Sequence, residues 1–411
     1  MNLVPVFFNI RIEFILFGLT LVGIAMFHKH TMVIALAGLL SVILIKLFFD
    51  THFSFVEHFL GNSNNIGEWK TVLNLAGLLF GFAILAKQFE ESNLPKKLPH
   101  YLPSDWKGPF LLLFMILILS SFLDNIAAAM IGGAIAFVVF KKKVHIGYLV
   151  AIVAASNAGG AGSVIGDTTT TLMWIDGVSP LHVLHAYIAS FAAFIIFGVI
   201  ASIQQDRYHR IMKDAPKHLK IDYNKLLIVA LILAGAIITN YSFDFPALGV
   251  WIAILAGSLF IQTPWGELKK AVQGSVFLLA LVACASLMPV DELPKASLSS
   301  TFILGFISAV FDNIPLTKLC LDQGGYDWGM LAYTVGFGGS MIWFGSSAGV
   351  ALSNEYPELR SVGKYLKYGW HVVLAYIVGF LVLFYIMGWK PQPAHKVDTR
   401  KNIQIEKYDP F

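Results

Sequence analysis

One polar stretch interrupts an otherwise apolar region of the sequence between Ser156 and Trp174. It reads SNAGGAGSVIGDTTTTLMW and follows the apolar run 146–155, so its polar groups are expected at membrane depth. Irregular backbone and ionisable side chains survive at that depth only where protein or a water-filled cavity covers them. Asp167, the carboxylate of this stretch, is therefore a candidate transport-site residue.

Two Asp-Asn pairs occur in related contexts elsewhere in the chain. Asp124 with Asn125, and Asp312 with Asn313, share the pattern S-x-x-[LF]-D-N-I. Each pair interrupts a longer apolar block and leaves two arms too short to cross a bilayer, as expected of a re-entrant hairpin. The sequence thus places up to three carboxylates at membrane depth.

The polar side chains of these stretches suit a hard cation. Carboxylate, amide and hydroxyl oxygens are the ligands that hard metal ions prefer, which favours Na⁺ or Li⁺ here. Acids clustered in a low dielectric resist full ionisation, so protons would compete with Na⁺ at Asp124, Asp167 and Asp312. We expect transported ions and no resident cofactor. The candidate ion- and proton-binding residues are Asp124, Asn125, Asn157, Asp167, Thr168, Asp312, Asn313, Ser346 and Ser347.

Structural roles are open for several of these residues. An Asp-Asn pair can cap a hairpin arm, and capping can coexist with coordination. The hydroxyls of residues 169–171 suit helix packing as well as ligation. Lys318 can pair with Asp322, extend to the outer surface, or balance a site carboxylate.

Composition identifies the class of protein. The 411 residues are 57% hydrophobic and 13% charged, with a mean hydropathy of +0.70, whereas about a quarter of the residues in an ordinary soluble protein are charged. The chain is therefore expected to be a polytopic membrane protein. Its net charge of +4 fits lysine-rich cytoplasmic loops and predicts no nucleic-acid partner. Cys284 and Cys320 lie in apolar segments, so neither a disulfide framework nor a cysteine metal site is indicated.

The elements that must position the candidate residues occur twice. We expect an all-α fold of two inverted repeats, each with three spans, a re-entrant hairpin, a broken helix and a closing span. The expected spans are 13–28, 32–49, 71–87, 182–204, 224–240, 246–262, 271–289 and 368–388. The expected divisions are a first repeat 1–204 with hairpin 109–140 and broken helix 146–175, a cytoplasmic linker 205–225, a second repeat 226–389 with hairpin 300–321 and broken helix 329–353, and a polar tail 390–411.

Glycines align the two broken helices. Equivalent glycines are expected to form the loops at the breaks, and this register sets Asp167 opposite Ser346 and Thr168 opposite Ser347. The chemistry is therefore asymmetric, with a carboxylate in one half and a hydroxyl in the other. The paired glycines are Gly159 with Gly338, Gly160 with Gly339, and Gly166 with Gly345.

Charge bias predicts that the repeats are inverted. With the N-terminus outside, the lysine- and arginine-rich loops fall inside and most acidic loops fall outside. The lysines of the tail oppose this orientation, but the loops outnumber them. Both termini are then outside, and the two hairpins open to opposite sides, as in many secondary transporters.

The motifs resemble those of the NhaD-type sodium/proton antiporters of the ion-transporter superfamily. The resemblance implies two inverted halves, an elevator-like movement, a homodimer and the inner membrane of a bacterium, with membrane lipids as surroundings. Ala127 and Ala128 stand where the antiporters tend to have threonines, which bears on ion selectivity. The residues that carry the resemblance are 157–160, 165–168, Trp174, 312–316, 338–340 and 345–350.

These features favour a cation/proton antiporter that exchanges Na⁺ or Li⁺ for H⁺. The alternative is a sodium- or proton-coupled transporter of a small anion, for which helix N-termini are suited and Lys318 is the evident counter-charge. A passive channel or a non-transporting membrane sensor is a further alternative. An enzyme is not favoured, because the sequence has no HExxH, GxSxG or paired-histidine pattern.

Overall fold

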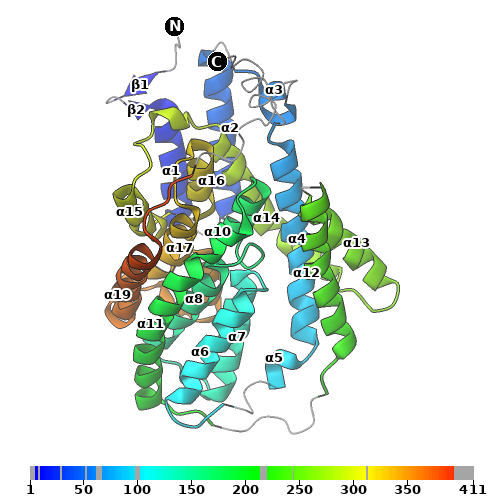
Figure 1. The fold of residues 1–411 in the computed structure, drawn as a ribbon, viewed down its shortest axis with the longest axis vertical. Helices are drawn as coiled ribbons and strands as arrows, with labels where there is room; N and C mark the ends of the chain where they lie inside the picture. The colour runs from blue at the N-terminus through cyan, green and yellow to red at the C-terminus, as the bar shows by residue number, and fades with distance from the viewer. Residues whose placement is uncertain are drawn as a thin grey trace, which may run out of the picture.

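The first half of the chain folds into helices in the predicted order. The computed structural model describes residues 5–7, 10–27, 30–50, 53–61, 67–97, 102–212, 220–243, 245–311 and 313–392. Asp312, residues 213–219 of the linker and residues 393–411 of the tail lie outside this set. The helices of the first half are α1 (Ile12–Met26), α2 (Thr31–Phe49), α3 (Phe55–Leu60), α4 (Trp69–Glu91), α5 (Leu94–Lys97), α6 (Lys107–Ser120), α7 (Asn125–Val139), α8 (Ile146–Ala161), α9 (Thr168–Ile175), α10 (Pro180–Leu184) and α11 (Ala186–Tyr208) (Figure 1).

The second half is also built of long and short helices. Its elements are α12 (Tyr223–Phe243), α13 (Pro246–Ser258), α14 (Gly266–Ser286), the 3₁₀ turn η3 (Val290–Glu292), α15 (Leu298–Ser308), α16 (Asn313–Gln323), α17 (Trp328–Gly338), η4 (Gly339–Met341), α18 (Ser347–Glu355), η5 (Pro357–Arg360) and α19 (Val362–Met387).

Two details differ from the predicted all-α pattern. A two-stranded antiparallel hairpin, β1 (Val6–Phe7) and β2 (Ile10–Arg11), precedes α1. The helix expected over 246–262 ends at Ser258, and Pro264 follows within the next loop, where its ring and missing N–H oppose helix.

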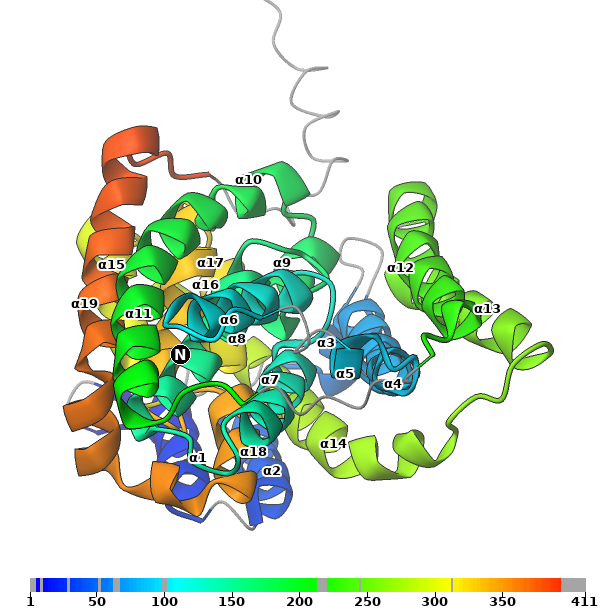
Figure 2. The ribbon, with the colours of Figure 1, turned by 90° about the horizontal axis from the view of Figure 1, so that it is seen from below.

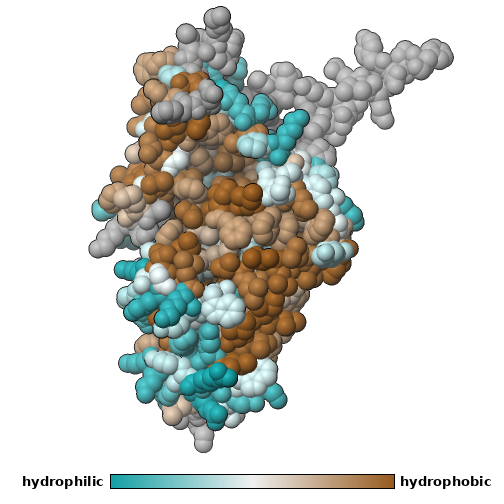
Figure 3. All heavy atoms as spheres, turned by 90° about the vertical axis from the view of Figure 1, so that its left-hand side faces the viewer, coloured by the Kyte–Doolittle hydropathy of each residue, from teal (hydrophilic) through white to brown (hydrophobic). Residues whose placement is uncertain are grey.

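The helical fold carries the surface of a membrane protein. Within the described part of the chain, six helices are long and apolar enough to cross a bilayer: α2, α4, α10 with α11, α12, α14 and α19. The arms α6 and α7 have 14 and 15 residues, short of the roughly 20 that a span needs. Hydrophobic residues cover the middle of the face in Figure 3, and hydrophilic residues gather at its lower end.

The two broken helices form the centre of the molecule. Residues 147–161 of α8 and every residue of α17 are buried, and α6, α11, α15 and α19 pack around them. Seen from below, α12 and α13 stand to one side, with α4 between them and this bundle (Figure 2). Small residues along α8 let its neighbours approach closely, as is usual between membrane helices.

Matching hydrogen bonds relate the two hairpins to the two broken helices. The Ser120 hydroxyl, at the end of α6, donates to the Ser156 carbonyl of α8 at 2.5 Å. The Ser308 hydroxyl, at the end of α15, donates to the Val335 carbonyl of α17 at 2.7 Å. Each hairpin is thus tied to its own broken helix by the serine that opens the shared sequence motif.

Candidate functional site

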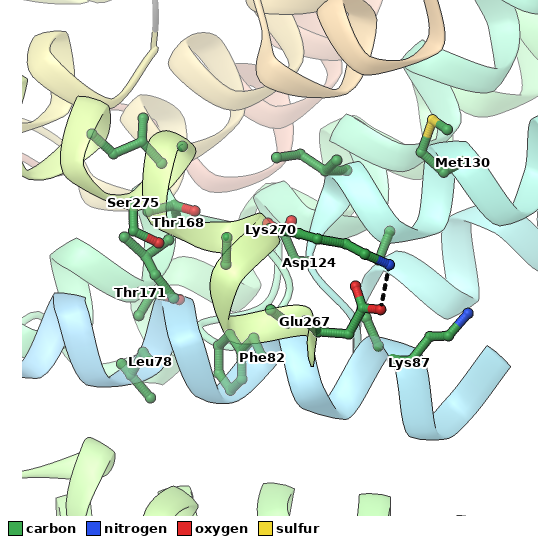
Figure 4. Close-up of a pocket in the computed structure, with 18 of the residues that line it drawn as sticks. Leu78, Phe82, Lys87, Asp124, Met130, Thr168, Thr171, Glu267, Lys270 and Ser275 are labelled. Atoms are coloured by element: carbon green, nitrogen blue, oxygen red, sulfur yellow. Dashed lines mark hydrogen bonds and ion pairs between the residues drawn. The ribbon is translucent and has the colours of Figure 1, made fainter. Parts of the chain in front are cut away.

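A cavity of about 430 Å³ lies beside α4 and is lined by both Asp124 and Asp167. Residues of α4 from Leu75 to Glu90 form one wall, and residues of α7, α9 and α14 form the others. In Figure 4, Thr168 and Thr171 of α9 lie at the left of the pocket, and Lys87 and Lys270 lie at the right. The pocket therefore brings the first hairpin and the first broken helix to one place.

Asp167 is held at the start of a helix. It caps the N-terminus of α9, and its Oδ1 accepts from the Thr169 backbone N–H at 3.4 Å. The Asn125 amide donates to the same Oδ1 at 3.2 Å. The side chain is 2% exposed, so these donors and the positive end of the helix stabilise a carboxylate that water barely reaches.

A chain of amides links this carboxylate to the second half of the protein. Asn125 Nδ2 also donates to Asn157 Oδ1 at 3.1 Å, and Asn157 Nδ2 donates to the Ser340 hydroxyl at 2.9 Å. Asn125, Asn157 and Ser340 are buried. The side-chain amide nitrogen of Asn125 has two N–H donors. One bonds to Asp167 and the other to Asn157, so Asn125 fixes these two side chains relative to each other.

Asp124 occupies the turn between α6 and α7, immediately before Asn125. It is half-buried, lines the pocket and interacts electrostatically with Asp167. Two like charges in one site favour binding of a cation or a proton between them. Of the first-half candidates, Asp124, Asp167 and Thr168 thus line one cavity, and Thr168 is half-buried at the first position of α9.

Glycines allow the close approach of the backbone segments that carry these groups. A Cβ at Gly160 would lie 2.8 Å from the Asp167 Cβ, and one at Gly166 would lie 2.1 Å from the Ser120 carbonyl oxygen. A Cβ at Gly336 of α17 would lie 3.4 Å from Asp167 Oδ2. The second broken helix therefore passes directly beside the carboxylate.

The threonines after Thr168 divide into two kinds. Thr170 and Thr171 donate their hydroxyls to the carbonyls of Ser163 and Val164, at 2.6 and 2.9 Å, and so tie α9 to the loop before it. This arrangement favours the packing role for both. The Thr169 hydroxyl is buried and makes no hydrogen bond with the described residues.

Among the described residues, the second-half candidates Asn313, Ser346 and Ser347 do not line the pocket. Asn313 is buried at the start of α16, and Ser346 caps α18 by accepting from the Gly349 N–H at 3.3 Å. Ser347 is half-buried at the first position of α18. Gly338, Gly339 and Gly345 make the same kind of close contact as their partners: a Cβ at each would lie 2.4 to 2.6 Å from a carbonyl oxygen.

Lys318 is occupied elsewhere. Its ammonium pairs with Asp322 at 2.6 Å and with Glu68 at 3.2 Å, and its side chain is fully buried. Of the three roles open to it in the sequence, pairing with Asp322 is the one observed. It does not line the pocket that holds Asp124 and Asp167.

Sequence reasoning missed Ser340 and the charged mouth of the pocket. Lys87 pairs with Glu90 at 2.8 Å on α4. Lys270 pairs with Glu267 at 2.7 Å on α14, as Figure 4 shows. In the sequence, these residues look like the charged residues that commonly flank the apolar part of a membrane helix. The signal that could have found them is their position, one or two turns beyond an apolar segment that borders the candidate site.

A family profile described as "CitMHS: Citrate transporter" matches residues 14–338. The chain belongs to this citrate transporter family. The family's range includes both hairpins and the first broken helix. The profile therefore covers the elements that build the pocket.

Curated relatives carry antiporter names. Sodium/proton antiporter 1 of Arabidopsis thaliana is 26% identical over 282 residues, which is 58% of this chain and 48% of the relative. The Na⁺/H⁺ antiporter NhaD of Vibrio cholerae is 23% identical over 287 residues, or 56% of this chain and 60% of the relative. NhaD of Alkalimonas amylolytica is 25% identical over 328 residues, 66% of this chain and 67% of the relative.

These relatives confirm the resemblance to NhaD-type antiporters that the motifs predicted. The match spans about half of the plant antiporter's length. Family and relatives alike are described as transporters.

Proposed function

We propose that the protein exchanges Na⁺ or Li⁺ for protons across a membrane. The observation that carries the proposal is that Asp124 and Asp167 line the same pocket. Asn125 donates a hydrogen bond to Asp167 there. Deprotonated carboxylates bind a hard cation, and the same oxygens bind protons when the cation leaves. The names of the NhaD relatives support this reading.

In the proposed cycle, Asp167 and Asp124 supply the charge and the neighbouring oxygens complete the ion's coordination. Asn125, Asn157 and Thr168 are the proposed partners from the first half. Asp312, Asn313, Ser346 and Ser347 are the proposed contributors from the second half, which would approach as the site changes sides. Competition between protons and cations at one set of oxygens couples the two fluxes.

The finer parts of the proposal concern assembly and movement. We propose two inverted repeats whose hairpins are re-entrant, with the broken helices moving in an elevator-like manner. The proposed homodimer is held by spans 13–49 and 224–262. The proposed location is the inner membrane of a bacterium, with both termini outside. Matching serine–carbonyl bonds in the two halves support the repeat.

The test is a ΔpH assay in everted vesicles that contain the protein. Addition of Na⁺ or Li⁺ is expected to collapse an imposed ΔpH, and Asp167→Asn is expected to abolish this response. Asp105→Asn, which neutralises an exposed carboxylate, is the matched control and keeps the response. A full response from Asp167→Asn would refute the role of Asp167.

A second candidate function is coupled transport of a small anion such as a carboxylate. The description of the family as citrate transporters favours it. Against it, Lys318 is neutralised by two carboxylates, and both pocket lysines are ion-paired. Uptake of labelled citrate that requires Na⁺, with no Na⁺-driven change of ΔpH in its absence, would select the anion transporter.

A further inference from the structure

A buried cluster of charges lies at the end of α4 away from the pocket mouth. Lys318 of α16 contacts Asp322 on its own helix and Glu68, the residue that precedes α4. Asp176, at the end of α9, adds a third electrostatic partner. The Lys318 side chain is 0% exposed, against 12% for Glu68 and 19% for Asp322. We call these four residues the Lys318 cluster.

Helix geometry places this cluster beyond the site. On α4 the pocket begins at Leu75 and its mouth is at Lys87 and Glu90; at about 1.5 Å per residue, Glu68 lies roughly 10 Å past the inner end. On α9, Asp167 is at the first end and Asp176 at the other, about 14 Å apart by the same rise. Along α4, the cluster and the mouth therefore lie at opposite ends of the pocket. Figure 1 shows α4 running along the long axis of the molecule, from α3 toward α5.

We propose that the ion pair between Glu68 and Lys318 closes the transport route on the side opposite the pocket mouth. The inference rests on the proposed transport function, because a protein that binds ions without moving them needs no second opening. In the structure, the pocket extends to Lys87 and Lys270, and the buried cluster lies beyond its other end. Opening that side separates Glu68 from Lys318.

The two ion pairs of Lys318 differ in what they join. Asp322 is four residues along the same helix, so this pair moves with α16 as a unit. Glu68 belongs to the start of α4, so its pair is made between two helices. When the helices part, Lys318 keeps Asp322, so the buried ammonium is not left unpaired, which is the costly outcome for a broken buried pair. The interhelical pair is thus the part suited to opening and closing.

Thiol accessibility tests the proposal directly. Cys284 and Cys320, both buried, are replaced by alanine, and Ala127→Cys introduces one reporter on the pocket wall. A membrane-impermeant cationic methanethiosulfonate is applied to inside-out and right-side-out vesicles. The parent is expected to react from the mouth side. Adding Glu68→Gln is expected to raise the reaction rate from the opposite side by about tenfold or more, because the closed state loses its interhelical charge pair.

The matched control is Glu267→Gln, which breaks the ion pair with Lys270 at the mouth and is expected to leave the opposite-side rate at the parent value. Glu68→Gln keeps the Lys318–Asp322 pair, so it is the variant least disruptive to folding. An unchanged opposite-side rate in Glu68→Gln, or an equal rise in Glu267→Gln, would overturn the proposal. The reaction needs no transported ion, so a negative ΔpH assay would count against the proposed exchange and leave this result standing.

Discussion

At the scale of single residues, the site depends on amides that hold charges in place. Asn157 accepts from Asn125 and donates to Ser340, so it joins the Asp167 side of the pocket to the second half of the chain. All three side chains are buried. Removal of Asn157 would leave a donor and an acceptor without partners in a site that excludes water.

Asn157→Ala should therefore weaken ion binding more than it alters the fold. Leaving buried polar groups unpaired costs about 1–3 kcal/mol, so the half-saturating Na⁺ concentration in the ΔpH assay is expected to rise by roughly tenfold. Asn224→Ala, at an exposed position of α12, is the comparison and should leave this value unchanged. Equal half-saturation in the two variants would show that the amide chain does not support the site.

At the scale of elements, contacts between the first hairpin and the first broken helix fix the pocket. The Ser121 hydroxyl donates to the Gly159 carbonyl, and the Ser163 hydroxyl donates to the Ser121 carbonyl at 2.6 Å. Gly166 lies directly against Ser120. The loop that precedes Asp167 is thus clamped to the turn that carries Asp124.

Gly166→Ala tests this clamp. Its Cβ would lie 2.1 Å from the Ser120 carbonyl oxygen, so the loop must shift, with a loss of about 1–3 kcal/mol typical of overpacking. A lower melting temperature in detergent and a weaker Na⁺ response are expected together. Gly18→Ala, where a Cβ meets nothing within 4 Å in α1, should leave both unchanged or slightly raise stability. Equal melting temperatures would contradict the close contact.

The breaks in the helices were predictable because polar residues and glycines stand out in apolar sequence. Asp124 does separate α6 from α7, and Asp167 does begin a new helix. The early end of α13 was not predicted, because the apolar run continues to Ile261 while Pro264 acts from beyond it. Ser340 was missed because its role depends on a contact with Asn157, 183 positions away. No local pattern encodes such a contact.

At the scale of the whole molecule, α4 connects the features that concern transport. Its start carries Glu68, its middle lines the pocket and its end carries Lys87 and Glu90. α13 braces it from the other side, since the Trp251 indole donates to the Gly77 carbonyl at 2.9 Å. α4 therefore lies between the bundle that holds the site and the α12–α13 pair (Figure 2).

If ions pass through the pocket, a bulky side chain within it should block them without harming the fold. Gly274 of α14 lines the pocket, and a Cβ there meets nothing within 4 Å. Gly274→Trp is expected to reduce the initial rate of Na⁺-driven ΔpH collapse at least several-fold at unchanged melting temperature. Gly363→Trp, at an equally open position of α19 outside the pocket, is expected to keep the parent rate. A parent-like rate in Gly274→Trp would place the route elsewhere.

The matching serine bonds at Ser120 and Ser308 draw attention to a difference between the two halves. Both halves keep the clamp between hairpin and broken helix, whereas the cap of the following helix is Asp167 in one half and Ser346 in the other. The contact that joins hairpin to broken helix is therefore shared by the two halves, whereas the chemistry of the cap is not. Ser346→Asp would place an acidic cap in each half and so remove this difference between them.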